Sequence, residues 1–339
     1  MALALWALTL GACAPLRPTG SLERFRFYSS QATRASWSLV LEDGARSAEL
    51  LIDGRVRDND CDRKGIQIRC ELRGMFPGGH TVELRLPNAV LHRSVLIGRP
   101  WPEQPLPTGL LLVRADTPEK IRELAEAGAD GIVLARASEE GVDAAHLHGT
   151  RAIIEGKIES DSASIERFGA DGVLGGAISG DLVRRFPEAR SFTIDVATTQ
   201  MIDHLQSCEA QAAISSTANA NGALVETHDA VGAALALAFA KTSGAIIDGS
   251  SDALLALLRA RKEHASLREG NVSLVSQDHC HLVVRFSRGH EQVDLLVNDG
   301  AEPWATKGVD LLSGPIAAVA PHAIAIFPVS SSSSDQTHY

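Results

Sequence analysis

Aromatic side chains are scarce in this sequence of 339 residues, where Phe, Trp and Tyr together make up 4%. The shortage is greatest between residues 109 and 250, which contain neither Trp nor Tyr. Sugar-binding clefts commonly stack the apolar C–H faces of a ring on Trp or Tyr. The composition therefore argues against an aromatic-lined sugar cleft in the middle of the chain.

Basic runs, CxxC pairs and nucleotide-binding glycine motifs are also missing. Acidic residues outnumber basic ones by 42 to 32, and no Lys/Arg-rich run occurs, which argues against a nucleic-acid surface. No CxxC occurs and no GxGxxG follows the strand near residue 109, so we predict no metal and no cofactor. The 45% hydrophobic and 22% charged residues are ordinary for a globular protein and exclude a disordered chain, a collagen or a polytopic membrane protein.

The first residues indicate export. An apolar run from Ala2 to Leu10 is too short to span a bilayer and is typical of a signal peptide, although it lacks a basic n-region. The run ends in Leu-Gly-Ala-Cys, which resembles the lipobox of bacterial lipoproteins and implies lipidation of Cys13. Ala14 stands where the inner-membrane retention signal would be Asp, which favours an outer-membrane anchor in the cell envelope. The alternative is a plain signal peptide with a chance cysteine.

Export would allow disulfides. Cys61 and Cys70 flank a turn at Lys64-Gly65 and are expected to staple a hairpin, whereas the pairing of Cys208 and Cys280 stays open. In His279-Cys280-His281, strand alternation would place the histidines and the cysteine on opposite faces, so we interpret the segment as a strand and not as a metal site.

Three folded regions follow the leader. We place a signal peptide and tether at 1–20, an immunoglobulin- or fibronectin-like β-sandwich at 21–105, a compact (β/α)8 TIM barrel at 106–265, an antiparallel β-domain at 266–330 and a disordered tail at 331–339. The sandwich assignment depends on period-2 runs separated by turn residues and on the Phe76-Pro77-Gly78-Gly79 corner.

The barrel assignment depends on eight short apolar runs with helical stretches between several of them. The runs begin near residues 109, 131, 151, 171, 191, 210, 222 and 244. The clearest helix starts at Thr117-Pro118 and ends at Gly128. Alternating strands and helices favour a parallel barrel, with an open doubly wound sheet as the rival. The 142 residues involved would make an unusually small barrel.

Motifs in the second half resemble the α-amylase family of glycoside hydrolases. Residues 223–229 (ALVETHD) and 244–249 (GAIIDG) are similar to that family's seventh and eighth strands. The helix at 254–270 is similar to the one that leaves the amylase barrel, and residues 310–314 and 320–327 to the last strands of its C-terminal domain. The resemblance covers about residues 109–328 and is weak over the first four strands.

The resemblance implies some of the family's catalytic residues in this sequence but not its nucleophile. It places the third carboxylate at Asp229, beside His228, and the acid/base at Asp195, which is one methylene shorter than the family's Glu. The nucleophile position falls on Gly176, which has no side chain, and the arginine before it on Leu174. A retaining glycosidase needs a nucleophilic carboxylate.

Two glutamates are further candidates. Glu226 lies at the end of the seventh predicted strand and is a third catalytic candidate with Asp195 and Asp229, whereas Glu155 ends the third strand and is a binding candidate with His228. Either glutamate would have to replace the missing nucleophile. Otherwise these carboxylates are inherited polar residues at the top of a barrel.

We therefore expect a lipid-anchored protein with an amylase-like frame that binds carbohydrate, such as an α-glucan, or acts as a scaffold without catalysis. Its partners would be the carbohydrate, the membrane, and a protein that contacts the N-terminal sandwich. The first alternative is an active α-glucan hydrolase with relocated carboxylates. The second is a phosphate-binding barrel, suggested by Gly175-Gly176 at a strand end.

Overall fold

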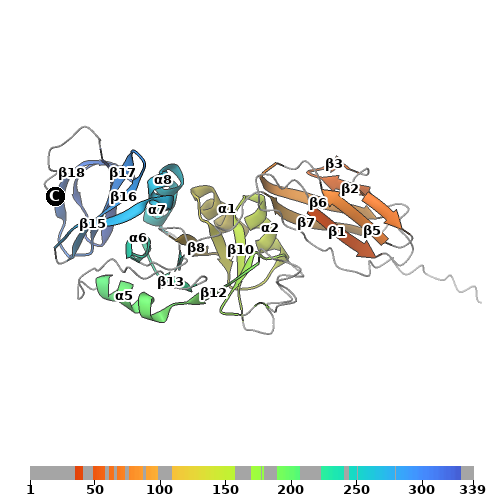
Figure 1. Ribbon diagram of the computed structural model, residues 1–339, viewed down its shortest axis with the longest axis horizontal. Helices are drawn as coiled ribbons and strands as arrows, with labels where there is room; N and C mark the ends of the chain where they lie inside the picture. The colour runs from red at the N-terminus through yellow and green to blue at the C-terminus, as the bar shows by residue number, and fades with distance from the viewer. Residues whose placement is uncertain are drawn as a thin grey trace, which may run out of the picture.

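The structure is a computed structural model of the chain. It describes residues 35–40, 49–57, 61–64, 67–72, 76–86, 89–97, 109–156, 169–176, 178, 189–206, 223–239, 244–249, 251–278 and 280–329. An antiparallel sandwich, a closed parallel barrel and a pair of antiparallel sheets follow one another along the chain, and Figure 1 shows them in a row. The predicted fold classes and their order are confirmed. The leader with Cys13, the predicted strand at 210–216 and the tail lie outside the described residues.

The sandwich has two antiparallel sheets, with strand orders β1-β5-β4 and β3-β2-β6-β7. The strands are β1 (Ala35–Val40), β2 (Glu49–Ile52), β3 (Arg55–Val56), β4 (Cys61–Lys64), β5 (Gln67–Leu72), β6 (Gly78–Leu86) and β7 (Ala89–Ile97). Leu50, Leu84 and Leu96 are almost completely buried. Cys61 and Cys70 are direct partners in the β4–β5 register, as a hairpin staple requires, and their disulfide stays a prediction.

The barrel closes in the order β10-β11-β12-β13-β14-β8-β9, with all neighbours parallel. The strands are β8 (Leu110–Arg114), β9 (Gly131–Leu134), β10 (Arg151–Glu155), β11 (Gly172–Leu174), β12 (Arg190–Ile194), β13 (Ala223–Thr227) and β14 (Gly244–Ile247). Each of them coincides with a predicted run. β12 pairs directly with β13, so the described ring contains seven strands. Closure at the β14–β8 seam needs Gly244, because a Cβ there would lie 2.2 Å from the Leu110 carbonyl oxygen.

Alternation along each strand divides the barrel core into two clusters. One cluster fills the interior with side chains from all seven strands, namely Leu110, Leu112, Val133, Ile153, Leu174, Phe192, Leu224 and Ile246. The other cluster faces outward against the helices. The interior is therefore packed with aliphatic residues and one phenylalanine, and only the strand ends can provide a polar site.

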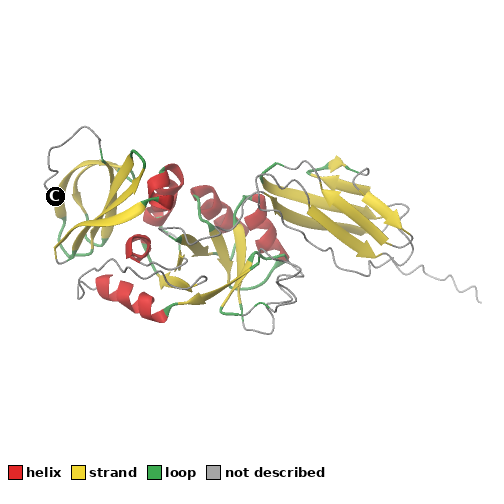
Figure 2. Ribbon diagram, in the orientation of Figure 1, coloured by secondary structure: helices red, strands yellow, loops and turns green. Residues whose placement is uncertain are grey.

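Two neighbouring helices cover part of the barrel, α1 (Pro118–Ala127) and α2 (Glu139–Leu147), and α2 is the one that contacts the sandwich. The predicted start and end of α1 are correct: the Thr117 hydroxyl accepts a bond from the Lys120 amide, and Gly128 ends the helix in the left-handed conformation. α2 is capped by Ser138 and buries Asp143 and His146. Figure 2 shows α2 between the barrel strands and the sandwich, with α1 beside it toward α7 (Asp252–Glu263).

The C-terminal region is built on helices α7 (Asp252–Glu263) and α8 (Ala265–Glu269) and two sheets, β15-β16-β17-β20 and β18-β19. The strands are β15 (Asn271–Asp278), β16 (His281–Arg288), β17 (Glu291–Asn298), β18 (Trp304–Asp310), β19 (Gly314–Val319) and β20 (Ala323–Pro328). The segment 310–314, expected to resemble one of the last strands, instead spans the end of β18, a turn at residues 311–313 and the first residue of β19.

The larger C-terminal sheet and the barrel share one core. Val284, Phe286 and Leu295 of that sheet belong to the same buried cluster as the helices α6 (Ala230–Phe239) and α7. The remaining helix, α5 (Val196–Gln206), follows β12. In the part of the chain that the structure describes, no helix is long and apolar enough to cross a bilayer.

Candidate functional site

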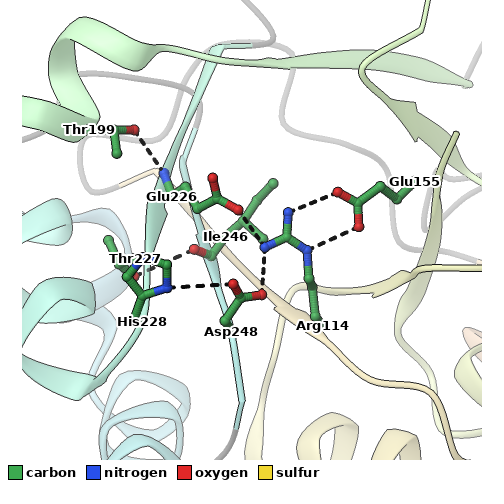
Figure 3. Close-up of polar contacts among 8 residues, drawn as sticks. All are labelled: Arg114, Glu155, Thr199, Glu226, Thr227, His228, Ile246 and Asp248. Carbon is green, nitrogen blue, oxygen red and sulfur yellow. Dashed lines mark hydrogen bonds and ion pairs between the residues drawn. The ribbon is translucent and has the colours of Figure 1, made fainter. Parts of the chain in front are cut away.

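Charged residues gather at the carboxyl ends of the barrel strands. Arg114 and Glu155 are the last residues of β8 and β10, Glu226 is the fourth residue of β13, and Asp248 directly follows β14. In a closed parallel barrel these ends meet on one face, where the sites of such barrels form. The four side chains meet there (Figure 3). We call them the Arg114 cluster.

The guanidinium of Arg114 is the centre of this cluster. Its Nε and Nη2 donate to the two oxygens of Glu155 at 3.1 and 3.0 Å, which is a bidentate pair. Its Nη1 donates to Glu226 Oε1 at 2.6 Å and to Asp248 Oδ1 at 2.5 Å. One cation therefore holds carboxylates from three different strand ends.

Burial and charge give the cluster a defined electrostatic character. The Arg114 side chain is 19% exposed, whereas those of Glu155, Glu226 and Asp248 are 39%, 31% and 40% exposed. Burial alone would lower the pKa of Arg114, but the hydrogen bonds to Asp248, Glu155 and Glu226 outweigh it and raise this pKa above its usual range. The guanidinium stays charged, and one cation with three carboxyl groups gives the cluster a formal net charge of −2, with acceptor oxygens open to solvent.

Two neighbouring residues contact members of the cluster. His228 Nδ1 lies 3.5 Å from Asp248 Oδ2, and its exposed ring lies at the edge of the cluster. The Glu226 amide donates to the Thr199 hydroxyl at 3.1 Å, which ties β13 to α5. Of the predicted site residues, the structure thus brings Glu155, Glu226 and His228 together.

The other two predicted catalytic residues cap helices. Asp195 accepts bonds from the Thr198 amide at 3.2 Å and the Thr198 hydroxyl at 2.7 Å, at the start of α5. Asp229 accepts from the Gly232 amide at 2.7 Å, at the start of α6. N-cap carboxylates satisfy free amides and favour the positive end of the helix dipole.

The positions aligned with the amylase nucleophile and its preceding arginine carry no polar side chain. Leu174 is buried inside the barrel. Gly176 follows β11, and its carbonyl oxygen accepts a bond from the Ser191 hydroxyl.

Sequence reasoning missed Arg114 and Asp248, although a usable signal was present. Each ends an otherwise apolar run, LLLVR and GAIID. A charge at the carboxyl end of a buried parallel strand points to the site face of a barrel.

Among the described residues, no group of three or more His, Cys, Asp or Glu side chains is arranged to hold a metal ion. Cys280 is disulfide-bonded and lies in the turn between β15 and β16, so the prediction that placed it inside a strand is wrong.

No protein-family model matches the sequence. No curated protein matches it either. Solved structures similar to the chain include a maltogenic amylase from S. marinus, at 8% identity over 90% of this chain and 82% of that chain, with a TM-score of 0.44. An α-amylase from Lactobacillus plantarum is 8% identical over 66% of this chain and 99% of that chain, with a TM-score of 0.45.

The N-terminal region has similar structures of its own. The Ig-like domain of human obscurin-like protein 1 is 19% identical over 27% of this chain and 93% of that chain, with a TM-score of 0.22. Similar structures also include putative α-galactosidases from Bacteroides fragilis, at 8–9% identity and with TM-scores of 0.40. The amylases among these neighbours belong to the family whose motifs the sequence resembles.

Proposed function

We propose that the barrel mouth binds a neutral, polyhydroxylated ligand such as an α-glucan and does not hydrolyse it. The Arg114 cluster is the observation that carries this proposal. Its three carboxylates are tied to one guanidinium and still expose oxygens that can accept hydrogen bonds from sugar hydroxyls. Its net negative charge disfavours a phosphorylated ligand, which weakens the phosphate-binding alternative.

The barrel mouth lacks the groups that hydrolysis by a retaining mechanism requires. A retaining enzyme needs one carboxylate as the nucleophile and one protonated carboxyl as the acid. Gly176 provides no nucleophile, and Asp195 is engaged as a helix cap. A guanidinium offers only donors, so the oxygens of Glu226 and Asp248 that face Arg114 act as acceptors and not as proton donors.

One observation favours the alternative of an active hydrolase. Glu226 Oε1 and Asp248 Oδ1 both lie within 2.6 Å of the same nitrogen, so these oxygens are no more than about 5 Å apart. Retaining glycosidases hold their carboxyl pair about 5–5.5 Å apart. If ligand binding drew Arg114 away, this pair would have the required spacing.

A paired assay separates the two functions. Maltoheptaose should raise the melting temperature of the full chain, and E155Q and D248N should reduce the shift, whereas E119Q, an exposed glutamate of α1, should not. The same preparations should release no chromophore from 4-nitrophenyl-α-maltoside above the protein-free rate. Turnover that D248N abolishes would establish the hydrolase instead, and the lack of any thermal shift would refute glucan binding.

We also propose that the chain is exported and lipid-anchored, which the signal-like leader at residues 1–20 supports. Lipidation at Cys13 would place the chain at the bacterial cell envelope, on the outer membrane, with the sandwich available to a protein partner. Cells fed a labelled fatty acid should label the wild-type chain and not C13A. Label retained in C13A would refute the anchor.

A further inference from the structure

The sandwich meets the barrel along strands β6 and β7 on one side and helix α2 on the other. Gly79 of β6 lies against the end of α2, where a Cβ would come within 2.0 Å of the His146 carbonyl oxygen and 2.7 Å of the Leu147 Cα. Backbones in such close contact leave no room for water between them. Polar side chains at this junction must therefore find partners within the protein.

A connected set of four side chains fills the junction. The Ser94 amide of β7 donates to Asp143 Oδ1 of α2 at 3.1 Å, and the Ser94 hydroxyl donates to the same oxygen. His146 of α2 places Nδ1 3.3 Å from the Ser94 hydroxyl oxygen and Nε2 2.7 Å from Asp171 Oδ2, at the start of β11. Ser94, His146 and Asp171 are completely buried. We call this set the junction latch.

The donors and acceptors of the latch fix the protonation of its histidine. The single hydroxyl proton of Ser94 points to Asp143, so toward His146 the serine oxygen can only accept. Asp171 Oδ2 also accepts the Ala152 amide at 2.8 Å, so it too is an acceptor toward the ring. Both ring nitrogens must then donate, and a histidine that donates from both is an imidazolium.

Other charged groups around the junction latch either favour or oppose a positive charge on the His146 ring. His92 of β7 lies 3.4 Å from Asp143 Oδ2 and is 44% exposed. Arg151 and Arg190 begin the strands β10 and β12 on either side of β11, and Glu119 and Arg122 of α1 line a cleft of about 710 Å³ that also includes His92 and Asp143. The carboxylate of Asp171 is hydrogen-bonded to the ring directly and that of Asp143 is connected to it through Ser94, and both carboxylates favour a positive charge on the ring.

We infer that His146 is a buried imidazolium that fastens the sandwich to the barrel, and that the junction latch weakens as the pH rises. A histidine in an unfolded or solvated segment loses its proton near pH 6.5. The closed junction retains this proton, so closing takes up a proton above that pH. The opening equilibrium should then increase by up to about tenfold per pH unit above about pH 6.5, until the closed form also loses the proton.

Two measurements on the full chain test this inference. Nitrogen NMR of selectively ¹⁵N-histidine-labelled protein reports whether both ring nitrogens carry protons, and H146Q identifies the signals of His146. Hydrogen exchange between pH 6 and pH 9, corrected for the intrinsic pH dependence of exchange, reports opening at residues 89–97 and 139–147. H148Q is the matched control, because His148 directly follows α2 and its side chain is 33% exposed.

We expect the His146 ring to be doubly protonated at pH 7.5. Protection of the junction peptides should fall with pH in wild type and H148Q, relative to peptides from β16 and β17, and should not depend on pH in H146Q. A neutral His146 ring at pH 7.5, or junction protection that parallels the reference peptides at every pH, would overturn the inference. If H146Q does not fold, wild type and H148Q still give both readouts.

Discussion

Arg114 is the residue on which the barrel mouth depends, because it provides the positive charge in contact with three carboxylates. Replacing it in R114M should lower the free energy of unfolding by about 1–3 kcal/mol at pH 7. This loss of stability is smaller than the loss on breaking a fully buried ion pair, because the carboxylates are partly solvated. Urea unfolding measures the change, and R136M, which alters an exposed arginine after β9, is the control.

Equal losses of stability for R114M and R136M would show that the Arg114 cluster does not act as an electrostatic unit.

At the scale of the elements, helix α6 shows how tightly the molecule is packed. Its residues Val231 and Ala233–Ala238 are all buried, because the helix lies between β13 and β14 of the barrel and β17 and β20 of the C-terminal sheet. A helix that is apolar on every side belongs inside a core. The many alanines allow both neighbours to approach closely.

Enlarging a side chain in α6 should therefore destabilise the fold. We expect A234L to lower the free energy of unfolding by about 1–3 kcal/mol through overpacking. A197L, at an exposed position of α5, should change it by about 0.5 kcal/mol or less. Chemical denaturation of the two variants provides the comparison, and a neutral A234L would mean that α6 has free space on one side.

The elements were predictable where local signals agreed. Runs such as GIVL and RAIIE are apolar and β-branched, and they form β9 and β10, while Thr117, Pro118 and Gly128 fix α1. The site was less predictable, because its geometry depends on which strand ends face one another. Asp195 and Asp229 looked catalytic from motif position, but each also directly precedes a helix, and the capping role is the one that the structure shows.

In the whole molecule, the barrel and the C-terminal sheet form one unit through their common core, whereas the sandwich is attached through the polar latch. Asp299, directly after β17, lies at the junction between the barrel and the C-terminal sheet. It is 8% exposed and contacts His322 Nδ1 at 3.0 Å. Burial raises its pKa, the negative charge of Asp229 on the barrel raises it further, and His322 opposes the shift.

This raised pKa determines how stability should vary with pH. The folded chain binds the Asp299 proton more tightly than the unfolded chain, so the contribution is fully present below the ordinary aspartate pKa of about 3.9 and is lost as the pH rises through the folded value. D299N cannot ionise and avoids this loss. Its stability relative to wild type should therefore improve between pH 4 and pH 7, as measured by urea unfolding, and the control D278N, an exposed aspartate of β15, should show less of this trend. If the stability of D299N relative to wild type instead falls as the pH rises, the Asp299 carboxylate stabilises the junction through its partners. The barrel and the C-terminal sheet are then held together by charge as well as by their common core.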